Sequence, residues 1–579
     1  MMKKHASVLA GTGAVLALGL WNLLDIEAAV HATGADWMWG VYAGLLVLAV
    51  GGAMGLGWLL LSAGRSGRKG KAGGGFSLER IYPAAGLFLG ILYLFVLPPL
   101  SAPDEISHFI SAYQLSNRIM GLPSNASDGR VLLRPEDVWL EDLDGIYEFE
   151  TDGEGNQKVV LESAEGSQVF GEVLDESVYE TIRELWPNGA YMPERTQEIM
   201  VQAGLSSETG QISGADPDRP SVGSMQPPVT TTPLAYAPQA AGITLGRLLG
   251  LHTLPLLYLG RLCNLLFFVL MTWLAMKRLP FGKEVLFGTA LLPMTLHLSA
   301  SFSYDVMIMG ALFCFTAVCL DLAYKKERVS WQDVLALAVL MAAAGPCKMV
   351  YAVFLGLCLL IPVRKFGGWG RWAAAALVVG GAWAAAMYLV NSQVIVSYAT
   401  TVQEESYVQW AGETGYSFGL MIHQPLRTLK MFYQTLLWQA QHYHLTMIGA
   451  YLGNLDQVLD VPYLLVAAFT LGLLGLALKK PGENETLQGG RRIWVFLLCG
   501  GCAAAIMASM LIAWTPLSSN VIVGVQGRYF LPFLPLLLMA LKNDRVVLTK
   551  DINRSILYLM CCMNSYELLH LFCVVCMRV

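Results

Sequence analysis

Two adjacent carboxylates and a histidine, Asp104, Glu105 and His108, follow an apolar stretch that is long enough to cross a membrane and that stops at Pro98-Pro99. Such a group at a membrane surface is suited to acid–base chemistry, because a carboxylate can take a proton from a hydroxyl group. The alternative is structural: the acidic pair would complement the positive end of a helix, with Ser101 as its N-cap. The rest of the chain favours the first interpretation.

Further polar side chains stand at the ends of other apolar stretches. The residues that we expect to gather with Asp104, Glu105 and His108 are Tyr236, Tyr304, Asp305, Lys348, Gln526, Arg528 and Tyr529. A longer segment on the same side adds His423, Gln441, His442 and His444. Charged groups at the edge of a membrane domain are costly unless they are paired or functional, so this convergence indicates a site.

Carboxylates and cations in one place suit group transfer from a lipid that carries a phosphate. A carboxylate deprotonates or orients the acceptor hydroxyl, while Arg528 and Lys348 neutralise the charge that develops on the departing phosphate. Structural interpretations remain open for the single residues. Arg528 or Lys348 alone could bind lipid headgroups, Asp305 could cap a helix, and His442 and His444 could be ordinary polar residues.

The composition predicts an all-α polytopic membrane protein. Of 579 residues, 55% are hydrophobic and 14% are charged, and the mean hydropathy is +0.51. Between residues 101 and 233, 7 Lys and Arg stand against 24 Asp and Glu, a local charge of −17 that argues against nucleic acid as a partner. All 11 cysteines lie in apolar segments, which predicts buried packing instead of disulfides or zinc.

The apolar stretches predict about thirteen spans, some short enough to be half-helices. They cover residues 6–24, 37–62, 81–99, 254–276, 284–299, 304–324, 332–346, 349–363, 372–390, 463–478, 494–514, 529–541 and 556–575. Lys or Arg follows every end that this order places inside, which predicts a cytoplasmic N-terminus and an extracytoplasmic Asp104. We expect a multi-pass protein of the cytoplasmic membrane.

The domain organisation follows from these spans. We expect two accessory helices in residues 1–64, a basic cytoplasmic linker in 65–80, the first core helix in 81–100, an acidic extracytoplasmic loop in 101–233 and the remaining core in 234–579. The acidic loop should hold a small α+β domain, with short strands in 138–160 and a helix in 176–186. Outer segments are expected at 391–460, with amphipathic helices in 425–440, and at 515–528.

The sequence from Pro103 to Ser116 resembles the opening motif of a family of bacterial membrane proteins, the domain of unknown function 2142 (DUF2142). Later stretches agree in order over roughly residues 81–541. They are Pro227-Pro228, Ala235 to Gln239, Leu259 to Asn264, Pro293-Met294, Ser301 to Asp305, Lys348 with Tyr351, His423 to Leu426, Gly449 to Asp456, and Gly527 to Pro535. As an ordered set these stretches are specific for the family and much less specific for a reaction.

That family is similar to the GT-C glycosyltransferases, so the resemblance implies a GT-C-like helical bundle. It further implies Asp104 as the general base, Glu105 as its neighbour in substrate or metal binding, and Arg528 with Lys348 as ligands of the donor phosphate. Two departures stand out. The Pro-Pro-x-Tyr region is stretched between Pro227-Pro228 and Tyr236, and Ile106-Ser107 replaces an expected Pro-Ala. This is an argument from analogy of fold.

The resulting hypothesis is a membrane glycosyltransferase that uses a polyprenyl-phosphate sugar and a cell-envelope polymer or glycolipid as acceptor. Asp104, Glu105 and Asp305 could ligate Mg²⁺ or Mn²⁺, although the sequence requires no metal or other cofactor. One alternative is a transporter or flippase for a polyprenyl-linked or anionic substrate. Another is a non-catalytic envelope-assembly protein whose acidic loop binds a partner.

Overall fold

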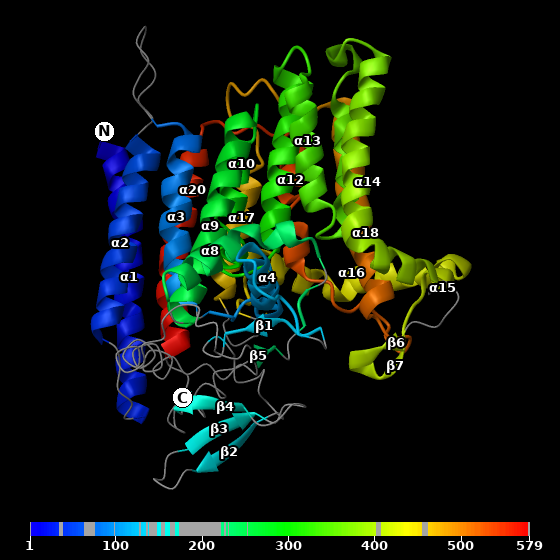
Figure 1. Ribbon diagram of the computed structural model, residues 1–579. Helices are drawn as coiled ribbons and strands as arrows, with labels where there is room; N and C mark the ends of the chain where they lie inside the picture. The colour runs from blue at the N-terminus through cyan, green and yellow to red at the C-terminus, as the bar shows by residue number, and fades with distance from the viewer. Residues whose placement is uncertain are drawn as a thin grey trace.

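The structure is a computed structural model. It describes residues 2–33, 39–62, 76–97, 99–126, 129–134, 137, 147–151, 157–161, 168–172, 222–224, 227–229, 231–251, 253–400, 407–453, 455 and 461–576. Most of these residues are helical, and the long helices stand side by side as a bundle (Figure 1). The expected class, an all-α protein with many membrane-spanning helices, is therefore confirmed.

Eight helices in the described residues are long and apolar enough to cross a membrane. They are α1 (Met2–Thr33), α2 (Trp39–Ser62), α3 (Leu78–Val96), α9 (Thr253–Arg278), α12 (Asp305–Leu320), α14 (Trp369–Thr400), α18 (Gly489–Trp514) and α20 (Asn553–Cys576). The π-helical turn η4 (Asp321–Lys325) extends α12. At the centre of the bundle, every residue of α12 is buried, so its apolar surface faces other helices on all sides.

The remaining expected spans form shorter or broken helices, so the count of thirteen is not confirmed. These elements are α10 (Lys283–Ala290), α11 (Pro293–Ser299), α13 (Trp331–Ala344), the 3-10 helix η5 (Met349–Leu360), α17 (Tyr463–Leu476) and α19 (Leu534–Leu541). The expected span 284–299 is divided because Pro293 lacks the backbone N–H that an uninterrupted helix would use. A short 3-10 helix, η6 (Val363–Phe366), precedes α14.

Basic residues gather at one end of the bundle and are held there by acidic partners. Arg278 at the end of α9 donates to Asp333 at 2.8 Å and lies 3.5 Å from Asp321. The buried Lys542 contacts Glu284 and donates to Glu483 at 2.8 Å. These pairs join helix ends that the sequence predicts on one side of the membrane.

The opposite end carries several short helices, one long helix and small sheets (Figure 1). The helices are α4 (Glu105–Ile119), η3 (Pro233–Tyr236), α8 (Ala237–Leu248), η7 (Gln409–Ala411), α15 (Phe418–His423), α16 (Pro425–Ile448) and η9 (Gly527–Phe530). A two-stranded sheet pairs β6 (Tyr407–Val408) with β7 (Glu413–Thr414). In α8, Arg247 is buried and donates to Asn117 of α4 at 2.8 Å, which attaches α8 to α4.

A small antiparallel sheet joins the two ends of the central part of the acidic loop. Strand β1 (Leu132–Leu133) pairs with β5 (Val222–Gly223), so the long insertion leaves and returns at one point. Within it, β2 (Tyr147–Thr151), β3 (Gln157–Leu161) and β4 (Gln168–Glu172) form an antiparallel sheet in that order. The expected strands are present, but the α+β domain is not confirmed, because the expected helix at 176–186 lies outside the described residues.

The first two helices pack on the last one. Both α1 and α2 contact α20, at one edge of the bundle (Figure 1). The ring of Tyr558 lies against Gly11 and Gly57, where a Cβ atom would meet ring atoms at 2.7 and 2.5 Å. The Tyr558 hydroxyl also donates to the Val8 carbonyl at 2.9 Å. Small residues in α1 and α2 thus allow close contact with α20.

Candidate active site

Arg528 joins two carboxylates from distant parts of the chain. Its guanidinium donates from Nη2 to Asp104 Oδ2 at 3.0 Å and from Nη1 to Asp305 Oδ2 at 3.1 Å. Arg528 Nε donates to the side-chain oxygen of Gln526. Asp104 precedes α4, Asp305 opens α12, and Arg528 lies in η9. The structure therefore brings together four of the residues that the sequence singled out.

Lys348 completes a cluster of charges around Asp305. Its Nζ atom lies 3.5 Å from Asp305 Oδ1, so Asp305 holds Lys348 and Arg528 next to each other. The same amine lies 3.5 Å from the centre of the Tyr529 ring and 5.4 Å from that of Tyr304, on which it is stabilised by cation–π contacts. Lys348 and Arg528 balance the charges of Asp305 and Asp104, so the cluster gains an excess positive charge, which suits a phosphate, when the exposed Asp104 turns away from Arg528.

Asp104 differs from Asp305 in being accessible. The side chain of Asp104 is 64% exposed, whereas that of Asp305 is 6% exposed. Asp104 also has a left-handed backbone, with φ of +57°, which is unusual for a residue other than glycine. The turn after α3 thus directs one carboxylate outward at the rim of the cluster, where an incoming molecule can reach it.

Glu105 points into the protein and not toward this cluster. It is 1% exposed, and its Oε1 and Oε2 atoms accept backbone N–H groups from Phe302 at 2.8 Å and Ala102 at 2.9 Å. The Nε atom of Arg261 lies 3.6 Å from Glu105 Oε1. Glu105 therefore ties the turn that carries Asp104 to the loop before Asp305, and it acts on the cluster by positioning both residues.

Replacing Glu105 should lower stability far more than replacing its neighbour. In Glu105→Gln an amide N–H₂ must face a backbone N–H group in a buried place, so we expect a loss of about 2–4 kcal/mol in the free energy of unfolding. Asp104→Asn should change it by less than about 1 kcal/mol, because the side chain is exposed and Asn tolerates the left-handed backbone. Denaturant unfolding of the purified protein in detergent compares the two variants, and equal losses would contradict this role of Glu105.

His108 lies one turn into α4 beneath the charged cluster. Its Nδ1 atom shares a hydrogen bond of 2.8 Å with the Tyr236 hydroxyl, and its ring meets that of Tyr304 edge-on at 4.9 Å. Its Nε2 atom is buried and has no hydrogen-bond partner among the described residues. Burial lowers the pKa of His108 to about 4, so the ring is neutral at neutral pH and is not a third cation of the site.

This low pKa predicts a loss of stability in acid. An unfolded histidine has a pKa of about 6.5, so below that pH the unfolded chain binds a proton that folded His108 takes up only near pH 4. The contribution of His108 should be constant above about pH 6.5 and fall by roughly 3 kcal/mol by pH 4. Unfolding of wild type and His108→Gln from pH 7.5 to 4.5 measures it: the difference between the two should shrink as the pH falls, and parallel curves would contradict the assignment.

A buried arginine and two amides hold the loop before Asp305. Arg261, in the apolar helix α9, is fully buried; it donates to the carbonyl of Ala300 at 2.5 Å and to that of Leu97 at 3.2 Å. Asn264 Nδ2 donates to Ser301 at 2.7 Å, and Gln239 Nε2 donates to the Phe302 carbonyl at 3.2 Å. No role was predicted for these three residues. A charged residue inside an apolar stretch is the signal that could have identified Arg261.

The element that carries Arg528 is fixed from two sides. The Tyr351 hydroxyl donates to the Tyr529 carbonyl at 2.8 Å, and the Gly527 N–H donates to Thr446 Oγ1 at 2.8 Å. A Cβ atom on Gly527 would lie 1.9 Å from the Tyr443 carbonyl oxygen, so only glycine fits there. Arg528 is thus held by η5 on one side and by α16 on the other.

The polar residues of the second outer segment do not join the cluster. His423 is exposed and its Nδ1 atom bonds the carbonyl of Gly419 in its own helix at 2.8 Å, and His444 Nε2 bonds Thr470 of α17 at 2.8 Å. Gln441 is exposed, and the His442 ring lies next to Tyr443. These four residues have local partners or face outward, so we assign them no part in the site.

The three carboxylates considered for a divalent cation do not form a ligand set. Glu105 is held by Arg261 and backbone N–H groups, while Asp104 and Asp305 both bind Arg528. Within the described ranges, no group of three or more His, Cys, Asp or Glu side chains is arranged to hold a metal ion. We therefore derive no step through Mg²⁺ or Mn²⁺.

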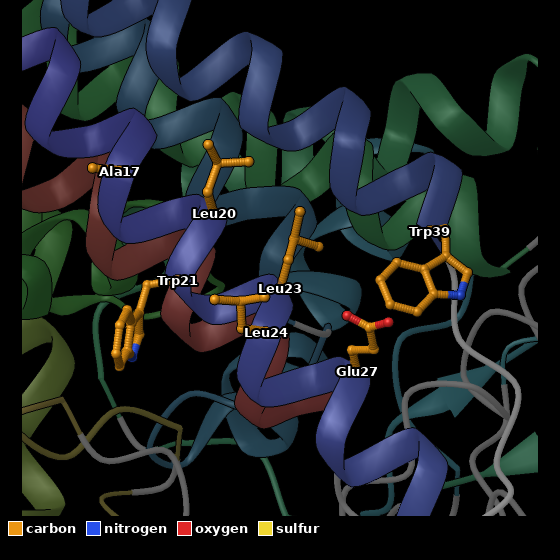
Figure 2. Close-up of a pocket in the computed structure, with 7 residues that line it drawn as sticks. All are labelled: Ala17, Leu20, Trp21, Leu23, Leu24, Glu27 and Trp39. Carbon is orange, nitrogen blue, oxygen red and sulfur yellow. The ribbon is translucent and has the colours of Figure 1, made fainter.

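A hollow between α1 and α2 is separate from this site. It has a volume of about 510 Å³ and is lined by Ala17, Leu20, Trp21, Leu23, Leu24, Glu27 and Trp39 (Figure 2). Glu27 is its single ionisable residue, and none of its residues belongs to the elements that carry Asp104, Asp305, Lys348 or Arg528. No Lys or Arg side chain lines this apolar hollow.

Residues 218–537 match the model of a family described as Predicted membrane protein (DUF2142). This range is more than half of the chain; it includes Asp305, Lys348 and Arg528 and begins after Asp104. None of the curated proteins and none of the solved structures matches the chain.

Proposed function

The chain belongs to this family of predicted membrane proteins, and on that premise we propose that it is a membrane glycosyltransferase. It moves a sugar from a polyprenyl-phosphate donor to a cell-envelope acceptor on the extracytoplasmic side of the bacterial cytoplasmic membrane. One observation carries the proposal: an exposed carboxylate, Asp104, shares Arg528 with a buried Asp305 that also binds Lys348.

The proposed reaction is an inverting displacement at the anomeric carbon. Asp104 accepts the proton of the acceptor hydroxyl while the acceptor oxygen forms a bond to that carbon. The bond from the carbon to the phosphate oxygen breaks, and its electron pair stays on the departing polyprenyl phosphate. The phosphate gains one negative charge in this step, which Arg528 and Lys348 neutralise.

The unequal exposure of the two aspartates supports this division of roles. A general base must reach the proton that it removes, and Asp104 is the exposed member of the pair. Asp305 is buried between Arg528 and Lys348 and keeps the two like charges together, so it is a positioning residue. When a donor phosphate binds to Arg528, we expect Asp104 to leave the guanidinium and turn to the acceptor.

The proposed sidedness rests on the distribution of positive charge. Lys277-Arg278, Lys325-Lys326, Arg364-Lys365 and Lys479-Lys480 follow helices that run to the end opposite Asp104. Because cytoplasmic loops carry the excess of Lys and Arg, we place that end in the cytoplasm. A lipid-linked sugar in the outer leaflet would then present its phosphate at the level of Arg528.

A transporter for a polyprenyl-linked or anionic substrate is the second candidate, and one observation favours it. Glu567 is fully buried in α20, where the Tyr93 hydroxyl of α3 donates to its Oε1 atom at 2.9 Å. Its Oε2 atom has no hydrogen-bond partner among the described residues. Ionisable residues inside spans often mark transport pathways.

Transfer of radiolabelled sugar by the purified protein tests the proposal. A panel of polyprenyl-phosphate sugars is offered with an extract of envelope acceptors, with and without a chelator. We expect label to move to the acceptor from at least one donor, and the chelator lane reports directly on metal dependence. Saturable donor binding without transfer from any donor would favour the transporter.

A further inference from the structure

Helix α16 presents three different faces. It runs crosswise to the long helices, at the end of the bundle that holds the site (Figure 1). One face packs on the protein: Met431 and Thr435 are buried, and Thr435 Oγ1 accepts the Ile522 N–H at 2.8 Å. A second face is polar, with Arg427, Lys430 and Gln434.

The third face of α16 is an unpartnered apolar stripe. Each of its large side chains is between 54% and 80% exposed. These side chains are Leu426, Leu429, Tyr433, Leu436 and Leu437. The spacing of three and four residues puts them on one side of the helix, opposite Thr435. Ile422, 57% exposed, continues this stripe onto α15. We call this set the α16 stripe.

The charged residues of α16 indicate that the stripe contacts a lipid surface. The helix contains Arg427 and Lys430 and no Asp or Glu. A helix with an apolar stripe and flanking cations is typical of segments that lie in the interface of a membrane with anionic lipids. Exposed Trp438 lies four residues after Gln434, on the polar side of α16, and exposed Trp410 stacks on Trp514 at the same end of the bundle. Tryptophan is enriched at the depth of the lipid headgroups.

We propose that α15 and α16 form an interfacial helix pair whose α16 stripe is buried among the acyl chains of one leaflet. Arg427 and Lys430 lie at the lipid phosphates. The occupant of this surface is thus lipid and not a second protein chain. This position of α16 at the lipid interface does not depend on whether the protein transfers sugars.

Helix α16 links the proposed lipid contact to the charged cluster. Its last turns hold η9, because Thr446 accepts the Gly527 N–H and the ring of Tyr443 meets that of Phe530 edge-on at 5.8 Å. Arg528 follows Gly527 directly. Insertion of the α16 stripe therefore sets the depth of Arg528 relative to the lipid phosphates.

Spin labelling of the full chain in nanodiscs of phosphatidylethanolamine and phosphatidylglycerol tests the proposal. Single cysteines are introduced at Leu429 and Leu436 on the α16 stripe and at Gln434 on the polar face as the matched control. The unsubstituted protein gives the background from native cysteines. Collision of each label with oxygen, which concentrates in lipid, is compared with collision with a water-soluble nickel chelate.

We expect the labels at 429 and 436 to collide severalfold more with oxygen than with the nickel chelate, and the label at 434 to show the reverse. Strong collision with the nickel chelate at 429 and 436 would place the stripe in water. Weak collision with both reagents there would mean that a protein covers it. Either result would overturn the proposal, and both are independent of any activity assay.

Discussion

Asp104→Asn should abolish sugar transfer while leaving donor binding and folding nearly unchanged. The amide has the size of the carboxylate but cannot take the acceptor proton, so we expect kcat to fall by about 10²–10⁴. Asn accepts the left-handed backbone at this position, and the side chain is 64% exposed, so little stability should be lost. Initial rates of transfer, with donor binding measured separately, check both parts.

The control for Asp104→Asn is Glu413→Gln, which changes a carboxylate of the same end of the bundle outside the cluster. Glu413 belongs to β7 and accepts a hydrogen bond from Ser518. This variant should transfer sugar at the wild-type rate. Full activity of Asp104→Asn would rule out its role as the general base, and equal loss in both variants would point to a general effect of outer-surface charge.

Arg528→Gln should weaken donor binding and slow transfer together. The guanidinium is 3% exposed and donates to both Asp104 and Asp305, so its loss removes charge-assisted bonds from the place where the phosphate would lie. We expect kcat/KM to fall by about 10²–10³. Arg528→Lys keeps the charge without the forked geometry and should fall between wild type and Arg528→Gln.

Arg528→Gln also leaves Asp305 buried with Lys348 as its remaining charged partner, so lost activity could reflect lost folding. The double variant Asp305→Asn with Arg528→Gln separates the two effects, because it removes the buried carboxylate as well. Its stability should recover toward wild type while transfer stays low. Recovery of transfer in the double variant would mean that Arg528 serves only to neutralise Asp305.

Much of the fold could be predicted from the sequence because hydrophobic length is a strong signal. A helix lies at each expected apolar stretch, and α3 ends at Val96, just before Pro98-Pro99. The number of helices long enough to cross a membrane was overestimated. Pro293 separates α10 from α11, so a stretch that is long enough to be predicted as one span forms two short helices.

The sequence predicts which charged residues meet better than it predicts the geometry of their contacts. Asp104, Asp305, Lys348 and Arg528 meet as expected, because charged residues at the ends of apolar helices have few other partners. The opposite directions of Asp104 and Glu105 could not be predicted, because they depend on the left-handed backbone of Asp104. Thr446 was missed as well, because its contact with Gly527 depends on the packing of α16.

The most direct test uses a donor labelled with tritium in the prenyl chain and with carbon-14 in the sugar, offered to the purified protein in liposomes with an acceptor. If the protein is a transferase, each carbon-14 sugar that reaches the acceptor leaves one tritiated polyprenyl phosphate behind, and Asp104→Asn forms neither product. Donor that binds or crosses the membrane with both labels still joined would contradict a transferase and identify a transporter.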